Sequence, residues 1–254
     1  MESALDYHTA KALLDWQVEF GVTETISETP INRFEVKPEP KKAAKAVVEN
    51  MPLHTRVDTP DGVTLARKAA AGASNVEALK TAIGAFESCE LKRGARNLVF
   101  GDGTLGARIM VIGEAPDREE DQAGRPFVGP AGLLLDKMLG AIDLNRAENV
   151  YLTLALPWRL PRNQEPRPED LAMMLPFLER HVALAAPECV VLMCNIACQA
   201  VLKKRGISRL RGQWFEALGL PVLPMFSPSY LLRNPEKKRD AWADLLSLKG
   251  RIRD

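Results

Sequence analysis

The chain has little cysteine, no long apolar run and no basic leader. Its four cysteines among 254 residues, Cys89, Cys189, Cys194 and Cys198, are too few for a disulfide framework. No stretch approaches the 18 or more uncharged apolar residues that cross a bilayer, and the first residues, MESALDYHTAKALLDW, carry acids where a signal peptide is basic. With 46% apolar residues the chain is expected to be globular and cytoplasmic, with no membrane partner.

Charge is balanced overall and uneven along the chain. The formal net charge is +1, yet residues 203–254 carry 12 Lys and Arg against 5 Asp and Glu. Such a segment suits a phosphate backbone, although a solvated helix face with a charged tail explains it equally simply. Charge alone therefore leaves both interpretations open.

Proline and apolar periodicity divide the chain into three parts. Residues 1–27 form an N-terminal helical element, because apolar side chains in 4–20 recur near the helical period. Residues 28–60 contain five prolines around the charged run KPEPKKAAK and are expected to form a linker. Residues 61–254 form the main domain. The N-terminal element is a candidate docking segment for a protein partner.

Short apolar runs alternate with helical patterns from residue 97 onward, which is typical of a parallel sheet covered by helices. We expect a three-layer α/β/α sandwich with a central, mostly parallel sheet of four strands. In such sheets the loops at the carboxyl ends of the strands build the ligand site. The expected strands are 108–112, 150–156, 189–193 and 222–226, and the expected helices are 130–142, 168–185, 196–204 and 235–248.

An acidic loop follows the first expected strand and reads GEAPDREEDQAGRPFVGPAG over residues 113–132. A glycine at a strand end permits a tight turn, and an acid directly after it stands at the mouth of the sheet. Crowded carboxylates raise one another's pKa and are useful where water is oriented or a cation develops. The alternative is a solvated acidic turn, so the loop is a candidate active site and no more.

This loop resembles the pattern GEAPGxxEDxxGxPFVGxAG of the family-four uracil-DNA glycosylases and departs from it only at Asp117, where the family has glycine. The resemblance continues through VYLTLALPWRLPRNQEPRPED (150–170), RLRGQW (209–214) and FSPSYLLRNPEKK (226–238), and covers about two thirds of the chain. Four matches in one order at expected strand ends form a specific pattern. The resemblance implies the glycosylase fold and hydrolysis of the bond between uracil and deoxyribose in DNA.

The resemblance also assigns roles to residues. Phe127 corresponds to the aromatic side chain that stacks on uracil, with core packing as the alternative. Glu114, Glu120 and Asp121 correspond to carboxylates that position water or shape the loop, and Ser227 stands at the catalytic histidine position. Gly113, Ala115, Pro116, Phe127 and Leu154 are the expected substrate-binding residues. Residues expected to contact DNA are Arg159, Arg211, Gly212, Pro228, Ser229, Tyr230 and Arg233.

Two polar groups of the family pattern are replaced. The asparagine that recognises the uracil amide edge corresponds to Leu154, which can neither donate nor accept a hydrogen bond. The histidine that donates to the leaving-group oxygen corresponds to Ser227, and removal of such a donor typically costs about 100- to 1000-fold in rate. The three histidines, His8, His54 and His181, lie outside the matched loops. Reduced activity is therefore expected.

The family's iron–sulfur cluster is predicted to be lost, and no metal is expected. Its four thiolate positions correspond to Phe86, Cys89, Trp158 and Met174, which leaves one ligand of the four that such a cluster needs. We expect the large apolar replacements to fill the cluster's volume, and the remaining cysteines, Cys189, Cys194 and Cys198, to be buried and inert.

Three functions remain open from the sequence. The first is an active glycosylase for uracil or a related damaged base. The second is a catalytically silent protein of the same fold that binds DNA or a protein partner. The third is an assembly protein in which residues 1–60 deliver an inactive domain to a partner.

Overall fold

A computed structural model describes residue 11, residues 61–161 and residues 164–253 of the chain. The expectations for the N-terminal element and the linker, residues 1–27 and 28–60, fall outside these residues except for Lys11. The folded part begins with two helices, α2 (Gly62–Ala71) and α3 (Val76–Ala85). Side chains cap both helices, because Asp61 accepts the N–H of Val63 and Asn75 accepts the N–H of Ala78.

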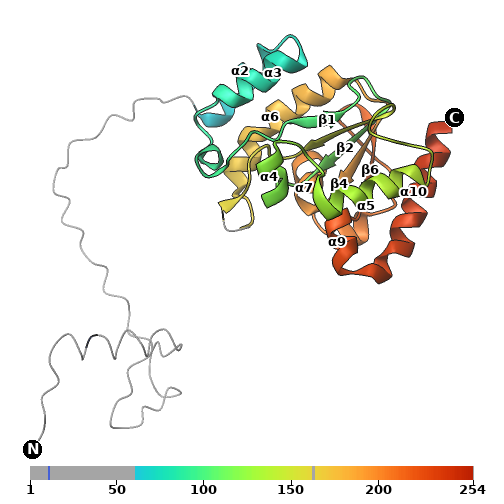
Figure 1. The fold of residues 1–254 in the computed structure, drawn as a ribbon. Helices are drawn as coiled ribbons and strands as arrows, with labels where there is room; N and C mark the ends of the chain where they lie inside the picture. The colour runs from blue at the N-terminus through green and yellow to red at the C-terminus, as the bar shows by residue number, and fades with distance from the viewer. Residues whose placement is uncertain (1–10, 12–60, 162–163, 254) are drawn as a thin grey trace, which may run out of the picture. The chain divides into compact units, whose positions relative to one another are not determined.

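A six-stranded sheet forms the centre of the domain, in the order β1-β3-β2-β4-β6-β5 (Figure 1). The four inner strands are parallel, and the two edge strands pair antiparallel with their neighbours. The register places Gly113 opposite Leu154, so the ends of two neighbouring strands lie side by side. The strands are β1 (Gly101–Gly103), β2 (Ile109–Gly113), β3 (Val150–Leu154), β4 (Cys189–Met193), β5 (Phe215–Ala217) and β6 (Leu220–Met225).

The predicted sandwich with a mostly parallel sheet is confirmed, and the strand number is corrected from four to six. All four expected strands are present and form the inner, parallel part of the sheet. The two additional strands, β1 and β5, have three residues each and lie at the edges. Such short segments carry too few side chains to show an alternating pattern.

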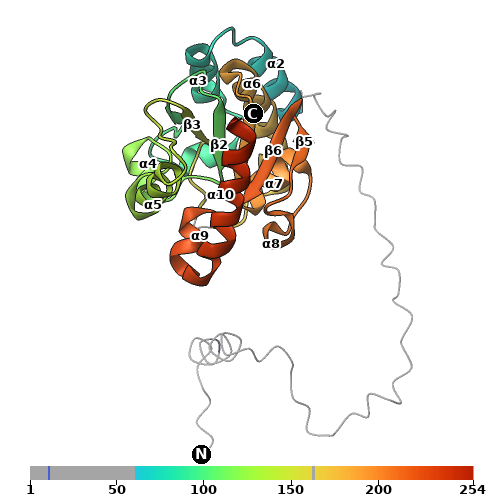
Figure 2. The same ribbon diagram turned by 90° about the vertical axis from the view of Figure 1, so that its right-hand side faces the viewer.

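Two hydrophobic cores cover the two faces of the sheet. Alternate residues of β2 point to opposite faces: Ile109 and Val111 pack in one core, and Met110 and Ile112 pack in the other. Figures 1 and 2 show the helices on either side of the sheet. The first core takes side chains from α5 (Gly129–Gly140), α9 (Pro228–Arg233) and α10 (Lys238–Arg253), and the second from α2, α3, α6 (Pro168–Ala185) and α7 (Asn195–Leu202).

The remaining elements are short and connect these layers. They are the 3-10 helices η1 (Glu90–Gly94) and η3 (Pro235–Lys237), and the helices α4 (Arg118–Ala123) and α8 (Ile207–Leu210). No helix among the described residues is long and apolar enough to cross a membrane.

Candidate active site

The carboxyl ends of the parallel strands open into a cleft of about 420 Å³. Turns that are far apart in the sequence meet there, because β2, β3 and β4 end at one edge of the sheet and the residues after β6 join them. The loop that begins with Gly113–Pro116 and the turn at Ser227–Ser229 therefore face the same cleft. Its lining consists of Gly113, Glu114, Ala115, Pro116, Asp117, Glu120, Phe127, Ala131, Leu154, Leu160, Gln164, Met193, Ser227, Pro228, Ser229 and Arg233.

The last residue of β2 must be small for the cleft to have this shape. A Cβ atom at Gly113 would lie 2.6 Å from Cδ2 of Leu154 and 2.7 Å from Cζ of Phe127. Real Cβ atoms do not approach other carbons this closely, because the repulsion is steep at that range. Glycine at this strand end therefore allows the Phe127 ring to lie across it and reach the cleft.

The backbone of Phe127 is held on both sides in a left-handed conformation with φ of 52°. Its N–H donates to the Glu120 carboxylate at 2.5 Å, and its carbonyl accepts from the Arg146 guanidinium at 3.1 Å. A Cβ at Gly132 would lie 1.9 Å from the Phe127 carbonyl oxygen, so the following helix can approach only because that residue is glycine. A strained backbone fixed in this way is typical of functional sites.

Glu120 braces this loop. Together with Asp117 it forms a capping box at the start of α4: the Asp117 carboxylate accepts the N–H of Glu120 at 2.8 Å, and the Glu120 carboxylate accepts the N–H of Asp117 at 2.8 Å. Burial raises the pKa of Glu120 to about 7, and the backbone hydrogen bonds from Asp117 and Phe127 oppose that rise. The one departure from the family pattern in this loop, Asp117, is thus the N-cap of a helix.

Glu114 is the carboxylate best placed to act on a molecule in the cleft. It directly follows β2 and is exposed to the cleft. Partial desolvation raises its pKa, while a hydrogen bond with the Cys194 side chain and attraction to Arg233 lower it. Cys194 follows β4 with φ of 134°, and its sulfur accepts the N–H of Ala197 at 3.3 Å. Sequence analysis missed this neighbour of Glu114, although its place after a strand was a usable signal.

Ser227 stands at the start of α9, and its Oγ accepts the N–H of Tyr230 at 3.3 Å. Because that bond uses an oxygen lone pair, the hydroxyl hydrogen remains available to a molecule in the cleft. Pro228, Ser229 and Arg233 of the same helix also line the cleft. Tyr230 does not, since its ring stacks on Phe226 with centroids 4.8 Å apart.

Comparison with known proteins decides the family. The sequence model of the uracil DNA glycosylase superfamily matches residues 100–246, the stretch that contains all six strands of the described sheet and every residue of the cleft lining. The chain belongs to the uracil DNA glycosylase superfamily. It is of the family-four type, as its relatives indicate.

Three type-4 uracil-DNA glycosylases are similar to the chain. The one from Thermotoga maritima is 39% identical over 150 residues, which cover 58% of this chain and 78% of that protein. The one from Archaeoglobus fulgidus is 34% identical over 165 residues, 61% of this chain and 82% of that protein. The one from Sulfurisphaera tokodaii is 30% identical over 174 residues, 65% of this chain and 79% of that protein.

The cleft of this superfamily member has few polar side chains where the resemblance places the groups that recognise a base. Leu154 lies in the cleft beside Phe127 and is 6% exposed, so an apolar side chain occupies the family's amide-reading position. Gln164 lines the same cleft and was missed by sequence analysis. It is the one amide among the described lining residues, and an amide offers both a donor and an acceptor.

Asp121 does not line the cleft, which differs from its predicted catalytic role. Its side chain is 5% exposed and accepts the backbone N–H groups of Arg96 at 2.8 Å and Asn97 at 3.2 Å. These bonds tie α4 to the segment before β1. Its neighbour in the sequence, Glu120, reaches the cleft, but backbone N–H groups engage both of its carboxylate oxygens.

The predicted DNA contacts at Arg211 and Gly212 also lie outside the cleft. The Arg211 guanidinium pairs with the buried Asp244 and donates to the backbone carbonyl of Asp240. Gly212 has φ of 73°, and its N–H donates to the carbonyl of Pro224 at 3.1 Å. This turn therefore fixes α10 against β6. Arg159 is absent from the lining too, and its buried Nε has no hydrogen-bond partner.

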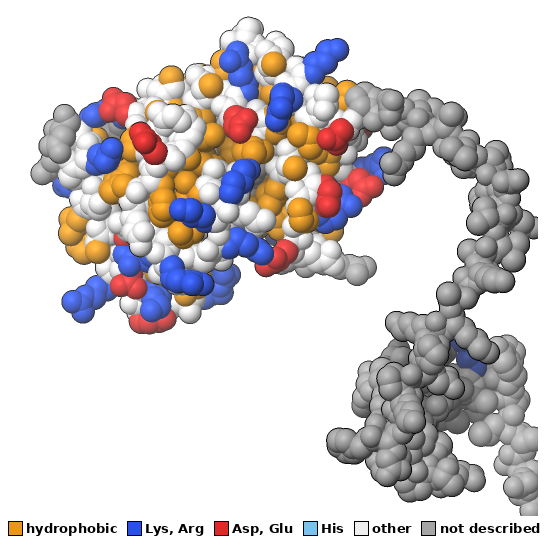
Figure 3. All heavy atoms as spheres, turned by 180° about the vertical axis from the view of Figure 1, so that it is seen from behind, with side chains coloured by type: hydrophobic (Ala, Val, Ile, Leu, Met, Phe, Trp, Pro, Cys, Tyr) orange, Lys and Arg blue, Asp and Glu red, His pale blue; other side chains and the backbone are white. Residues whose placement is uncertain are grey.

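Part of the basic excess of residues 203–254 is paired with acids of the fold. On the face shown in Figure 3, Lys and Arg side chains lie among apolar side chains and are interspersed with Asp and Glu. Arg211 is held internally by Asp244, and Lys249 pairs with Asp143. Of the basic side chains in this segment, Arg233 is the one that lines the cleft.

The family-four cluster positions carry the wrong chemistry for a four-iron cluster. A phenyl ring, an indole and a thioether stand at Phe86, Trp158 and Met174, and Cys89 supplies one thiol. Four thiolates normally hold such a cluster, so these residues do not fit it. All four cysteines are free and buried, and burial raises the pKa of Cys189 to about 11 and that of Cys198 to about 12.

Proposed function

We propose that the chain hydrolyses the N-glycosidic bond of a uracil flipped out of DNA, at a lower rate than a protein with the full set of family groups. One observation carries the proposal: the Glu114–Phe127 turn and the Ser227 turn converge on one cleft of about 420 Å³. The type-4 relatives, whose names state the uracil-DNA substrate, support it. A DNA substrate also supports the proposal that the protein acts in the cytoplasm.

The base must leave the helix before it can reach this cleft. Its bond to the sugar is inaccessible in the stack, and extrusion costs a few kcal/mol. Phe127 offers an aromatic face to the flipped base, and stacking of this kind contributes about 1–3 kcal/mol per base. Because both backbone groups of Phe127 are already hydrogen-bonded, the ring needs no reorganisation on binding.

Glu114 is the residue that we assign to the sugar. As the bond to the base breaks, positive charge develops on the sugar, and a water molecule adds to the same carbon. The Glu114 carboxylate stabilises that charge, accepts a hydrogen bond from the attacking water and takes the proton that the water loses as it adds, while the base leaves with the electron pair of the broken bond. Glu114 lines the cleft directly after the end of β2, at the mouth of the sheet.

Ser227 is the donor that we assign to the leaving base. Its free hydroxyl hydrogen can point to a carbonyl oxygen of the uracil anion as that anion leaves. Serine is shorter than histidine and carries no positive charge, so the stabilisation is weaker. Gln164 is the candidate reader of the polar edge, and Ser229 and Arg233 are candidates for contact with the phosphate backbone.

The test is a single-turnover assay on uracil-containing single- and double-stranded DNA, followed by alkaline cleavage of abasic sites. Phe127→Ala should lower the excision rate about 10- to 100-fold through the loss of stacking. Ser227→His should raise it by at least tenfold. Trp242→Ala, exposed on α10 away from the cleft, is the matched control and should leave the rate unchanged. If neither cleft variant alters the rate, the cleft is assigned wrongly.

A second function, DNA binding without excision, is favoured by the replacements at Leu154 and Ser227. Under this alternative no abasic sites form with any variant. The affinity for DNA should still fall steeply with salt, since phosphate contacts release counterions. Absence of both excision and salt-dependent DNA binding would favour a protein that acts by binding another protein. The segment proposed to bind that partner, residues 1–27, lies outside the described residues except for Lys11.

A further inference from the structure

The four positions to which the family resemblance assigns cluster ligands lie in the same hydrophobic core of this chain. They belong to three separate segments: Phe86 and Cys89 lie between α3 and η1, Trp158 follows β3, and Met174 belongs to α6. Their exposed fractions are 7%, 1%, 2% and 2%, and all four belong to one continuous hydrophobic cluster. We call Phe86, Trp158 and Met174 the apolar plug.

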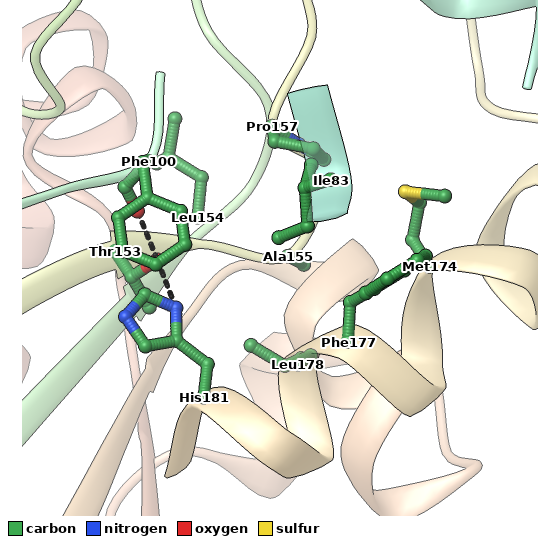
Figure 4. Close-up of a pocket in the computed structure, with 10 residues that line it drawn as sticks. All are labelled: Ile83, Phe100, Thr153, Leu154, Ala155, Pro157, Met174, Phe177, Leu178 and His181. Atoms are coloured by element: carbon green, nitrogen blue, oxygen red, sulfur yellow. Dashed lines mark hydrogen bonds between the residues drawn. The ribbon is translucent and has the colours of Figure 1, made fainter. Parts of the chain in front are cut away.

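Packing around the apolar plug leaves little space. The Phe86 ring meets the Phe177 ring edge to face, with centroids 5.2 Å apart. Figure 4 shows Met174 and Phe177 on the wall of a neighbouring cavity, which Pro157 also lines and whose volume is about 20 Å³. A cavity of that size holds about one water molecule. A metal group could enter only if several of these side chains moved.

Cys89 behaves as a small apolar residue in this setting. A cysteine that holds a metal does so as a thiolate, whereas Cys89 is 1% exposed and packs within the hydrophobic cluster. Among the described residues, no group of three or more His, Cys, Asp or Glu side chains could hold a metal ion. Cys89 therefore has no partner ligands within the part of the chain that is described.

Trp158 of the apolar plug belongs to the segment that forms one wall of the cleft. Trp158 lies between Leu154 and Leu160, which both line the cleft, and the segment that contains it is tied down by a hydrogen bond from the N–H of Val99 to the carbonyl of Pro157 at 2.9 Å. Anchoring Trp158 in the core thus fixes the direction in which this segment leaves β3. A cluster bonded at the same positions would impose a similar restraint.

We propose that the apolar plug has taken over the structural task of the iron–sulfur cluster, so that side-chain packing alone holds the wall from Leu154 to Leu160. The protein then requires no iron, and oxidants that destroy such clusters leave its fold intact. This inference concerns the cofactor and the fold, and it stands or fails independently of glycosylase activity.

The first experiment measures iron in the full chain. Protein purified without oxygen should contain less than about 0.1 iron per chain and show no absorbance band near 400 nm, because four suitable ligands are needed to hold a cluster. Stoichiometric iron would overturn the proposal. The readout requires no DNA substrate, so its failure is distinct from a failure of the proposed function.

The second experiment restores the ligands. The triple variant Phe86→Cys, Trp158→Cys and Met174→Cys, together with native Cys89, is reconstituted with iron and sulfide under anaerobic conditions. We expect about four irons per chain and a band near 400 nm. The matched control adds Cys89→Ala to the same triple variant and should take up far less iron. A folded triple variant that binds no more iron than this control would overturn the claim that the plug occupies the cluster site.

A third measurement covers the case in which the triple variant fails to fold. Trp158→Ala should lower the Tm by about 10 °C, because a buried indole is lost from a tightly packed site. Trp242→Ala removes an exposed indole and should change the Tm by less than about 2 °C. Equal Tm values for these two single variants would show that Trp158 holds nothing in place and would overturn the proposal.

Discussion

His181 is a buried imidazole whose protonation should destabilise the fold. It lies on α6 with its Nε2 2.9 Å from the Tyr151 hydroxyl and its Nδ1 3.5 Å from Oγ1 of Thr153, and its ring stacks on Phe100 at 4.2 Å (Figure 4). Thr153 donates its own hydrogen to the carbonyl of Phe100 at 2.7 Å. His181 therefore donates from Nδ1, and Nε2 accepts from Tyr151, an arrangement that requires the neutral ring.

The sign and size of the effect follow from the two pKa values of His181. Burial lowers the pKa of His181 to about 4 in the folded protein, against 6.5 in an unfolded chain. The unfolded chain therefore binds the proton more tightly. The stability contributed by the neutral ring is complete above pH 6.5 and is lost as the pH falls from 6.5 to 4. The difference in pKa corresponds to about 3 kcal/mol in the free energy of unfolding.

Urea unfolding of the wild type and of His181→Gln at pH 7 and pH 4 tests this expectation. Glutamine does not titrate, and other titrating groups contribute equally to both proteins. The wild type should therefore lose about 3 kcal/mol more than the variant between the two pH values. An equal loss in both proteins would refute the reasoning, since His181 would then carry no shifted pKa.

Four further substitutions probe the cleft and the loop that shapes it. Gly113→Ala should lower the excision rate at least tenfold in the single-turnover assay, because the new methyl would displace the Phe127 ring; an unchanged rate would contradict the assigned ring position. Glu120→Ala should lower the free energy of unfolding in urea by about 2–3 kcal/mol, because two hydrogen bonds from backbone N–H groups are lost. Asp117→Ala loses one such bond and should lower it by about 1 kcal/mol. Equal decreases for the two variants would argue against the role of Glu120 in holding the loop. Leu154→Asn should raise the rate of uracil excision relative to the rate of hypoxanthine excision, measured on DNA that contains one or the other base. An equal rise in both rates would exclude a role of residue 154 in base recognition.

Much of the inner sheet could be predicted from the sequence because each strand is buried on both faces. β2, β3 and β4 are apolar at every position or nearly so, and such runs are recognisable without neighbours. The edge strands β1 and β5 could not be predicted, since GDG and FEA owe their extended form to the partner strand. α4 was missed because its capping box lies in a run of acids that reads as a loop.

The candidate site was predictable where one stretch of sequence builds it. Glu114 and Phe127 lie in the same motif, and the cleft contains both. Asp121 and Arg211 show the limit of prediction from motifs. The Asp121 carboxylate accepts a backbone N–H, and the Arg211 guanidinium donates to Asp244, so neither side chain lines the cleft. Side-chain direction depends on tertiary packing, and no local pattern records it. Gln164 was missed for the same reason.

The brace by Glu120 has a consequence for how this protein can change. Glu120 accepts the N–H of Phe127, and Asp117 accepts the N–H of Glu120. All three residues lie within ten positions of one another, so one short stretch of sequence fixes this part of the site. Leu154 ends β3 and Ser227 caps α9, and neither contributes a side-chain hydrogen bond to that loop. The loop that positions the aromatic ring for a bound base is thus separate from the residues that distinguish one base from another. Laboratory evolution could therefore change selectivity at Leu154 and Ser227 without altering that loop.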